Sequence, residues 1–481
     1  MQSNGVKSGI FDGVDRWAVL YYLLIVLFGC VCITSASSED SAGSFFSFGN
    51  FYMKQLLWVG VAWTFALLVL LLDASLFHKW AYVFYGVGVL LLVAVLLFGR
   101  EVNGAKAWFE FGPMRWQPVE VAKIATALAL ARLMSEYSFS ITKPGNLVKV
   151  AMLLLVPLSI IVLQNDTGSG IVLGSFLFVL YREGLNKWLC IPILMVAALF
   201  IVSMLLSPVA LLLMMICVCI LSEAMMNGVW RSRIVFLSAL FLGSILLYFL
   251  AQFFFPGRLS YYGSLLAVTL CGVLFVAVYA LRVRLSNIFL MLGLFVCSMI
   301  FLPTTDYLFD SVLKPHQQNR IKSFLGIIND PAKLDYNVNQ SKIAIGSGGL
   351  LGKGFMQGTQ IKYGFVPEKH TDFIFCTVGE EWGFVGTSAL LVVYCLLILR
   401  LMRMGERQEE PFGRIYCYCV ASILLFHAMV NIGMTIGLMP VMGIPLPFMS
   451  YGGSSLLAFT VLLFIAIRLD ASTKTFTFRS L

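Results

Sequence analysis

A few ionisable side chains at the ends of apolar segments are the residues best suited to chemistry. Asp372 lies in the stretch Val366–Gly386, where the polar residues from Pro367 to Asp372 run into an apolar segment of helix length. A positioned carboxylate can act as a general base toward a hydroxyl group. By itself, a Thr-Asp pair before an apolar run is also an ordinary helix N-cap. Capping and catalysis are therefore both open for Asp372 on this pattern alone.

Residues 103–124 form a second polar element before an apolar stretch. Glu120 and Lys123 are three residues apart, which puts them on one face of the helix that Pro118 is suited to begin. Ionisable residues inside a membrane usually face the interior of a helix bundle or a wet cavity. A structural ion pair that holds two helices together is the alternative interpretation. Trp108 fits either a binding site or the aromatic belt of a membrane interface.

Two further polar regions flank apolar segments. Asp166 lies in a glycine-containing break, where it either caps a short turn or faces the same cavity as Lys123. The interval 303–372 is long and contains four dispersed cations: Arg320, Lys322, Lys342 and Lys353. Such an interval suits either an amphipathic helix on the membrane surface or a cationic lining for a phosphate-bearing ligand.

Composition places these residues in a membrane. Of the 481 residues, 60% are hydrophobic and only 12% are charged, whereas soluble domains contain about 25% charged residues. The net charge of +9 fits cationic loops on the cytoplasmic side of a membrane protein. We therefore expect membrane lipids around the chain and no nucleic-acid partner.

Two patterns that resemble familiar sites are rejected. Residues Gly346–Gly354 fail the phosphate-loop pattern at Ser347 and again at Gly354. The glycines are instead expected to let the backbone turn tightly along the membrane surface. Six of the cysteines form pairs two residues apart within apolar runs, so each pair points to different faces of a helix. The cysteines therefore indicate neither a disulfide nor a metal site.

Segments of membrane-spanning length, which need roughly 20 apolar residues, recur along the whole chain. Before the long polar interval they lie near 17–35, 53–73, 79–98, 117–134, 146–164, 168–184, 188–206, 207–226, 232–255, 262–281 and 285–302. After it they lie near 373–400, 412–438 and 450–468. We therefore predict an all-α polytopic membrane protein with about fourteen transmembrane helices, forming a single integral domain over residues 1–481.

The cationic connections indicate which side of the membrane each end faces. Arginine and lysine residues gather at alternate connections and at the C-terminus, and all of them are cytoplasmic if the N-terminus is cytoplasmic. The interval 303–372 is then a large extracytoplasmic loop before the last three helices. Asp372 lies at its end, at the outer face of the membrane.

Several segments together resemble the SEDS family (shape, elongation, division and sporulation), whose members include RodA, FtsW and SpoVE. The matching residues are Gln117-Pro118, Glu120 and Lys123; His316, Gln317 and Arg320; Pro367–Phe375; and Asn431, Gly437, Pro440, Gly443, Phe448 and Ser450–Ser455. Residues 344–354 look more like RodA than FtsW. The blocks cover most of the chain except its middle.

The resemblance implies a peptidoglycan glycosyltransferase that polymerises lipid II at the periplasmic face of the bacterial inner membrane, for cell elongation and shape. It implies that Asp372 is the catalytic general base, that polyprenyl pyrophosphate leaves, and that a class B penicillin-binding protein supplies transpeptidation. Positive charge for the leaving group would come from Lys123, Arg320, Lys369 or a divalent cation, Mg²⁺ or Mn²⁺. No metal ligand is assigned in the chain. We predict substrate contacts at Lys106, Trp108, Glu120, Lys123, Asp166, Arg320, Lys369 and His370.

The chain departs from the family pattern in three places. The usual G-A-x-R-W becomes Gly104–Trp108 without its arginine, which leaves open whether Lys106 compensates. The usual Q-P-D-L-G-T becomes Gln164–Ser169, which keeps Asp166 but lacks the proline. Residues 188–302 contain about five spans where the family has one, so about four helices are inserted into a family core of roughly ten.

Two other functions fit the same residues. The main alternative is a flippase that transports the lipid-linked precursor, because the buried Glu120 and Lys123 could serve transport. Moving a pyrophosphate head across the bilayer would need charge distributed through its depth, but the polar residues gather toward the outer side. A purely structural scaffold is the third interpretation, and it would predict that Asp372 is dispensable.

Overall fold

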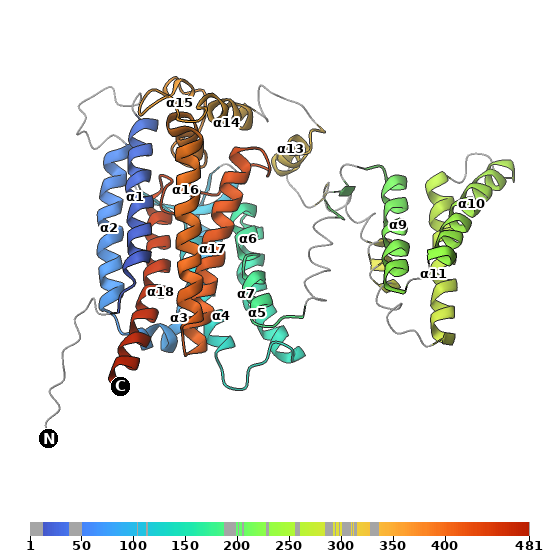
Figure 1. Cartoon of the computed structure of the whole chain (residues 1–481), viewed down its shortest axis with the longest axis horizontal. Coiled ribbons are helices and arrows are strands. Elements are labelled where there is room, and N and C mark those ends of the chain that lie inside the picture. The colour runs from blue at the N-terminus through green and yellow to red at the C-terminus, as the bar shows by residue number, and fades with distance from the viewer. Residues whose placement is uncertain are drawn as a thin grey trace. The chain divides into compact units, whose positions relative to one another are not determined.

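The computed structural model divides the chain into two compact units. Unit 1 comprises residues 1–186 and 330–481, and unit 2 comprises residues 187–329. The structure describes residues 13–37, 51–102, 104–111, 114–186, 199–200, 202–203, 206–227, 230–254, 260–283, 292–293, 295–297, 299–300, 309, 311, 315–327 and 336–480. Figure 1 shows the chain with its elements labelled.

Unit 1 is a bundle of apolar helices. Its helices are α1 (Arg16–Ala36), α2 (Phe51–Leu71), α3 (Ala74–Phe98), α4 (Pro118–Met134), α5 (Pro144–Leu163), α6 (Thr167–Leu173), α7 (Phe176–Arg182), α14 (Tyr336–Ser347), α15 (Thr359–Lys362), α16 (Ile374–Glu406), α17 (Pro411–Thr435) and α18 (Gly453–Ser480). Each of the nine spans predicted in these regions coincides with a helix, and α6 and α7 together form the sixth. Across the described residues, nine helices of both units are long and apolar enough to cross a membrane. The protein is a helical polytopic membrane protein.

A small antiparallel sheet follows α3 and corrects the prediction of an all-α fold. Its strands are β1 (Arg100–Val102), β2 (Ala105–Phe111) and β3 (Met114–Trp116), in the order β1-β2-β3. The spans predicted near 79–98 and 117–134 leave a segment between them that is too short and polar to span a membrane. The aromatic residues of β2 and β3 instead pair across the strands, with Phe109 opposite Trp116, an arrangement that stabilises sheets. Glu110 pairs with Arg115 across the same two strands.

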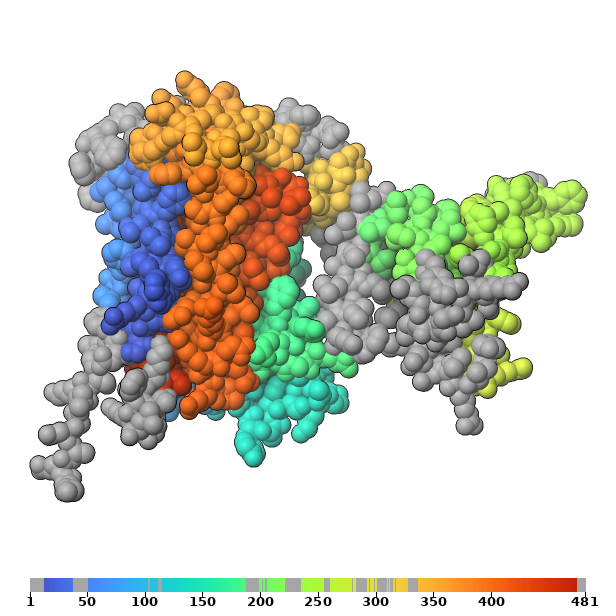
Figure 2. Space-filling model, viewed as in Figure 1, coloured from blue at the N-terminus to red at the C-terminus, as the bar shows by residue number. Residues whose placement is uncertain are grey.

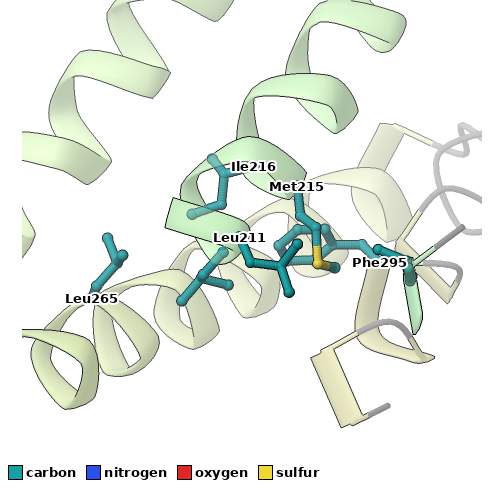
Figure 3. Packing of buried hydrophobic residues seen from close by; sticks show 7 residues of the cluster. Leu211, Met215, Ile216, Leu265 and Phe295 are labelled. Atoms are coloured by element: carbon teal, nitrogen blue, oxygen red, sulfur yellow. The ribbon is translucent and has the colours of Figure 1, made fainter. Parts of the chain in front are cut away.

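Unit 2 has its own apolar core. Its helices are α9 (Pro208–Asn227), α10 (Trp230–Phe254), α11 (Tyr261–Val283) and α13 (Pro315–Phe324). Leu211, Met215 and Ile216 of α9 pack with Leu265 of α11 and with Phe295, all less than a tenth exposed (Figure 3). Three of the five spans predicted in 188–302 coincide with α9, α10 and α11. The other two, near 188–206 and 285–302, fall largely outside the described residues.

The last part of the predicted extracytoplasmic loop folds onto unit 1. The helices α14 and α15 belong to this unit, and Figure 2 shows residues of this region covering the ends of α1 and α16. Ala344 and Ile361 are buried there together with Ala36 and Phe373. The segment directly before Asp372 is therefore part of the packed unit.

Candidate active site

A non-helical loop, residues 436–452, joins α17 to α18 and forms the centre of the candidate site. Its three prolines disfavour a continuous helix through the segment. Gly443 has a φ of 67°, a left-handed conformation that glycine adopts without strain. A Cβ added at Gly443 would lie 3.5 Å from Oδ2 of Asp372. The loop backbone therefore approaches the Asp372 carboxylate at a residue that has no side chain.

Asp372 lies one residue before the N-cap of α16, which is Phe373. Its side chain is half-buried. The amide Nδ2 of Asn431, on α17, donates to the Asp372 carbonyl at 2.8 Å and to the Ile444 carbonyl at 2.7 Å. One buried side chain thus ties the backbone of Asp372 to the 436–452 loop.

The two residues before Asp372 are bound to the same loop. Ser450 Oγ donates to the Thr371 carbonyl at 2.7 Å, and the backbone N–H of Tyr451 donates to the His370 carbonyl at 2.8 Å. The His370 ring stacks on Phe51 with ring centroids 4.5 Å apart, and it meets Tyr451 edge-on at 5.8 Å. His370 is thus held in an aromatic cluster two residues from Asp372, where its contacts orient the Asp372 segment.

Glu120 and Lys123 form a buried ion pair within α4. Lys123 Nζ lies 2.9 Å from Glu120 Oε2, and both side chains are less than a twentieth exposed. The same ammonium lies 3.0 Å from Nε2 of His427 and 4.9 Å from the centroid of the Phe459 ring. The pair joins α4 to α17 and α18, and its charges compensate each other inside the bundle.

Asp166 caps the short helix α6. Its carboxylate accepts hydrogen bonds from the Ser169 N–H at 3.1 Å, the Ser169 hydroxyl at 2.8 Å and the Gln117 amide at 2.8 Å. This is the capped turn that the sequence left open. The first turn of α6 also touches the central loop, because a Cβ added at Gly168 would lie 2.5 Å from the Met442 carbonyl.

Three predicted substrate-binding residues contact other parts of unit 1. Lys369 is buried, and its Nζ donates to the Ile361 carbonyl at 2.8 Å. Lys106 Nζ donates to the Leu97 carbonyl at 3.1 Å, at the C-terminal end of α3, where a cation is favourable. Trp108 lies in β2, paired with Arg100. These three contacts are made outside residues 370–372 and the 436–452 loop.

Lys106 does not take the place of the arginine that the family pattern contains. Ala107 stands where the pattern has that arginine, and it is 1% exposed. Neighbouring residues of a strand point to opposite faces, and the Lys106 side chain is bound to the end of α3. Arg320, the remaining predicted residue, lies on α13 in unit 2.

The glycine-rich segment 346–354 has a function that the sequence did not indicate. The helix α16 is interrupted at Gly383, where φ is 62° and ψ is −159°. Lys353 N–H and Gly354 N–H donate to the carbonyls of Glu380 and Glu381, each at 3.0 Å. In return, the N–H groups of Phe384 and Val385 donate to Gly349 and Leu350, at 2.9 and 3.0 Å. The segment therefore fills the break in α16 by pairing with its exposed backbone groups.

A buried carboxylate fixes the next stretch of chain beside this break. Glu380 is fully buried and accepts four hydrogen bonds, at 2.7 Å from Lys353 Nζ, 3.2 Å from Thr359 Oγ1, 2.9 Å from Gln360 N–H and 2.9 Å from Ile361 N–H. It thereby caps α15. The neighbouring Glu381 is buried as well.

Sequence reasoning missed His427 and the part played by Asn431. His427 lies in the middle of the apolar helix α17 and is 2% exposed. A titratable residue at such a position is a functional candidate by default, and its spacing of four residues from Asn431 puts both on one face. That signal was present in the sequence. Within the described residues, no three His, Cys, Asp or Glu side chains are grouped closely enough to hold a metal ion.

A family model for cell cycle proteins, FTSW_RODA_SPOVE, matches residues 15–216 and 212–475. The chain belongs to this family. It is 32% identical over 450 residues to the peptidoglycan glycosyltransferase RodA of Treponema pallidum, covering 93% of this chain and 95% of that protein. It is 30% identical over 462 residues to the peptidoglycan glycosyltransferase MrdB of Escherichia coli K12, covering 95% of this chain and 94% of that protein.

Solved structures have the same fold. A chain of a peptidoglycan synthase complex, described as coordinating polymerization and crosslinking, is 26% identical with a TM-score of 0.61, covering 96% of this chain and 98% of that chain. The RodA crystal structure from Thermus thermophilus is 24% identical with a TM-score of 0.54, covering 96% of this chain and 97% of that chain. The SEDS resemblance, closer to RodA than to FtsW, is confirmed by the family match and the RodA-type relatives.

Proposed function

We propose that this protein is a peptidoglycan glycosyltransferase that polymerises lipid II into glycan strands for cell elongation and shape. The two curated relatives are named as peptidoglycan glycosyltransferases, and the matches cover 95% and 94% of their lengths. The proposed environment is the bacterial inner membrane, with the active site facing the periplasm. Nucleotide donors are absent there, so the donor sugar has to bring its own leaving group, which a polyprenyl pyrophosphate provides.

The observation that carries the proposal is the way Asp372 is held. Its carboxylate faces a glycine, and bonds from Asn431, Ser450 and Tyr451 fix residues 370–372 to the 436–452 loop. A rigidly held carboxylate is suited to act as a general base. It would take the proton of the acceptor hydroxyl while that oxygen attacks the anomeric carbon and the polyprenyl pyrophosphate leaves. A single displacement of this kind inverts the carbon and needs no second nucleophilic carboxylate.

The leaving pyrophosphate needs positive charge. Two of the cations predicted to supply it already have partners inside unit 1. Lys123 is paired with Glu120, and Lys369 donates to a backbone carbonyl; both side chains are buried. Arg320 is exposed on α13 of unit 2. We propose that a divalent cation such as Mg²⁺ or Mn²⁺, bound by the substrate's own phosphates, supplies this charge.

The rest of the proposal concerns the whole assembly. We propose about fourteen transmembrane helices, with both termini cytoplasmic and the 303–372 segment outside. We also propose a class B penicillin-binding protein as the crosslinking partner, because a similar chain belongs to a complex that couples polymerization with crosslinking. Transport of the lipid-linked precursor is less well supported. The charges of Glu120 and Lys123 compensate each other, so they offer little to a pyrophosphate crossing the bilayer.

Polymerisation of purified lipid II by the detergent-solubilised protein with its penicillin-binding partner tests the proposal. We expect Asp372→Asn to lower the rate by about 100-fold to 10,000-fold, the usual contribution of a general base. Glu368→Gln is the matched control, because Glu368 is an exposed acid four residues away whose carboxylate accepts a hydrogen bond from the Thr371 hydroxyl. It should retain the wild-type rate. Equal polymer from wild type and Asp372→Asn would remove Asp372 as the base, and no polymer from a folded wild-type complex would favour transport or scaffolding.

A further inference from the structure

His427 connects the ion pair of α4 to the loop beside Asp372. Its Nε2 lies 3.0 Å from Lys123 Nζ, and its Nδ1 lies 3.2 Å from the carbonyl oxygen of Pro445. The ring packs edge-on against Phe459 at 4.8 Å and is 2% exposed. Each ring nitrogen therefore contacts a different element, one in α4 and the other in the 436–452 loop.

The hydrogen-bonding partners determine the tautomer of His427. A lysine ammonium only donates, so Nε2 must accept the hydrogen bond from Lys123 and cannot carry a proton. The Pro445 carbonyl only accepts, so the proton resides on Nδ1. A doubly protonated ring would also place a second positive charge 3.0 Å from the ammonium in a buried site. The arrangement fits the neutral imidazole with hydrogen on Nδ1.

Asn431 lies one turn further along α17, on the same face as His427. It binds the Ile444 carbonyl, whereas His427 binds the Pro445 carbonyl. Two consecutive carbonyls of the loop are thus held by two side chains of one helix face. The residue before Ile444 is Gly443, whose backbone faces the Asp372 carboxylate. A shift of this loop would move the groups that hold Asp372.

We propose that His427 is a positioning residue that uses the Glu120–Lys123 ion pair to hold the 436–452 loop in register with Asp372. The inference rests on the proposed glycosyltransferase function and adds a residue to it. Lys123 then serves the reaction from inside the bundle, by anchoring His427. The ring nitrogens of His427 contact Lys123 and the Pro445 carbonyl, and the side chain is buried. Its loss should therefore lower kcat and leave the KM for lipid II nearly unchanged.

Three variants test this. His427→Phe keeps the ring and deletes both nitrogens, and His427→Gln keeps one acceptor and one donor. Tyr416→Phe is the matched control, because it removes one buried hydrogen bond from the same helix, to Leu462, away from the loop. Initial rates of polymerisation at varied lipid II concentration, with partner present, give kcat and KM. Thermal unfolding of each variant shows whether it is folded.

We expect His427→Phe to lower kcat by about 10-fold to 100-fold, as small misplacements of reacting groups do, with KM changed less than about 3-fold. His427→Gln should recover most of kcat, and Tyr416→Phe should match the wild type. Wild-type kcat in His427→Phe would overturn the proposal, as would equal losses in His427→Phe and Tyr416→Phe. A raised KM at unchanged kcat would also overturn it, because that result indicates a substrate contact.

If His427→Phe does not fold, a comparison of His427→Gln with His427→Asn tests whether the side chain bridges Lys123 and Pro445. Gln and Asn carry the same amide, but Asn is one methylene shorter and cannot reach from Lys123 to Pro445. A bridging function therefore predicts a higher kcat for His427→Gln than for His427→Asn, and equal values would overturn it. Absence of polymer from the wild type would instead contradict the glycosyltransferase function, so the two failures are distinguishable.

Discussion

Asp372 is fixed through its backbone by residues distant in the sequence. Asn431 donates to its carbonyl, and Ser450 and Tyr451 hold the two residues before it. Fixing the backbone limits where the Asp372 carboxylate can move. Preorganisation of this kind lowers the cost of reaching the transition state. It also makes the activity depend on residues that never meet the substrate.

Asn431→Leu tests that dependence at the scale of one side chain. Leucine has a similar volume but no donor, so the carbonyls of Asp372 and Ile444 would lose their Asn431 hydrogen bonds. An unsatisfied buried polar group costs about 1–3 kcal/mol, so we expect a lower unfolding temperature and a loss of polymerisation larger than the loss of folded protein. Ser422→Ala on the same helix is the control, because the Ser422 hydroxyl donates to the Cys419 carbonyl within that helix. Wild-type activity in Asn431→Leu would contradict this account.

At the scale of elements, the break in α16 and the glycine-rich segment depend on each other. A helix interrupted at Gly383 exposes backbone groups that lipid cannot satisfy. The 346–354 segment satisfies them, and its glycines allow the close approach: a Cβ added at Gly348 would lie 2.0 Å from the Gly379 carbonyl. The half of α16 that follows Asp372 is thereby attached to the segment that covers it.

Gly352→Ala should disturb this docking. Gly352 has a φ of +80°, and an added Cβ would lie 2.1 Å from the Glu381 carbonyl. Left-handed backbone costs a residue with a Cβ about 1–2 kcal/mol, and the clash adds to it. We expect a clear fall in the thermal unfolding midpoint. Gly346→Ala is the matched control, because Gly346 is helical with nothing within 4 Å of an added Cβ, and alanine favours a helix by about 1 kcal/mol. Equal midpoints for the two variants would refute the docking argument.

The sequence predicted the helices of unit 1 well because an apolar run of sufficient length is a local property. It could not predict contacts between distant segments. Three features depend on the packed bundle: the pairing of residues 349–354 with 380–385, the sheet of β1, β2 and β3, and the Lys123–His427 contact. The motif around Asp372 marked its segment as a candidate site, but nothing local indicated that Asn431 would hold the backbone of Asp372. Lys106 was ambiguous for the same reason, since its direction depends on strand pairing.

At the scale of the whole molecule, an ion network ties the helix ends on one side of unit 1. Asp15, which precedes α1, accepts hydrogen bonds from Arg400 of α16 and from Arg407 at the end of α16. Arg407 also binds Asp470 of α18. Burial raises the pKa of Asp15, but the hydrogen bonds from the two arginines and from the Ala18 N–H outweigh it, so the pKa falls to about 2. Asp15 therefore stabilises the fold when ionised, and this contribution disappears as the pH falls from about 4 toward 2.

The arginines of this network are among the cations from which the cytoplasmic side of the membrane is predicted. An experiment that shows which end of unit 1 faces which side of the membrane therefore tests the proposed topology directly. Figure 1 places α15 at one end of unit 1 and the connection between α4 and α5 at the other. Tyr363, directly after α15, is 64% exposed, and Tyr137, in the other connection, is fully exposed. In a cysteine-free background, Tyr363→Cys should react with a membrane-impermeant maleimide on intact spheroplasts, and Tyr137→Cys only after permeabilisation. The reverse pattern would put Asp372 on the cytoplasmic side, where a lipid II polymerase that builds an external wall could not work.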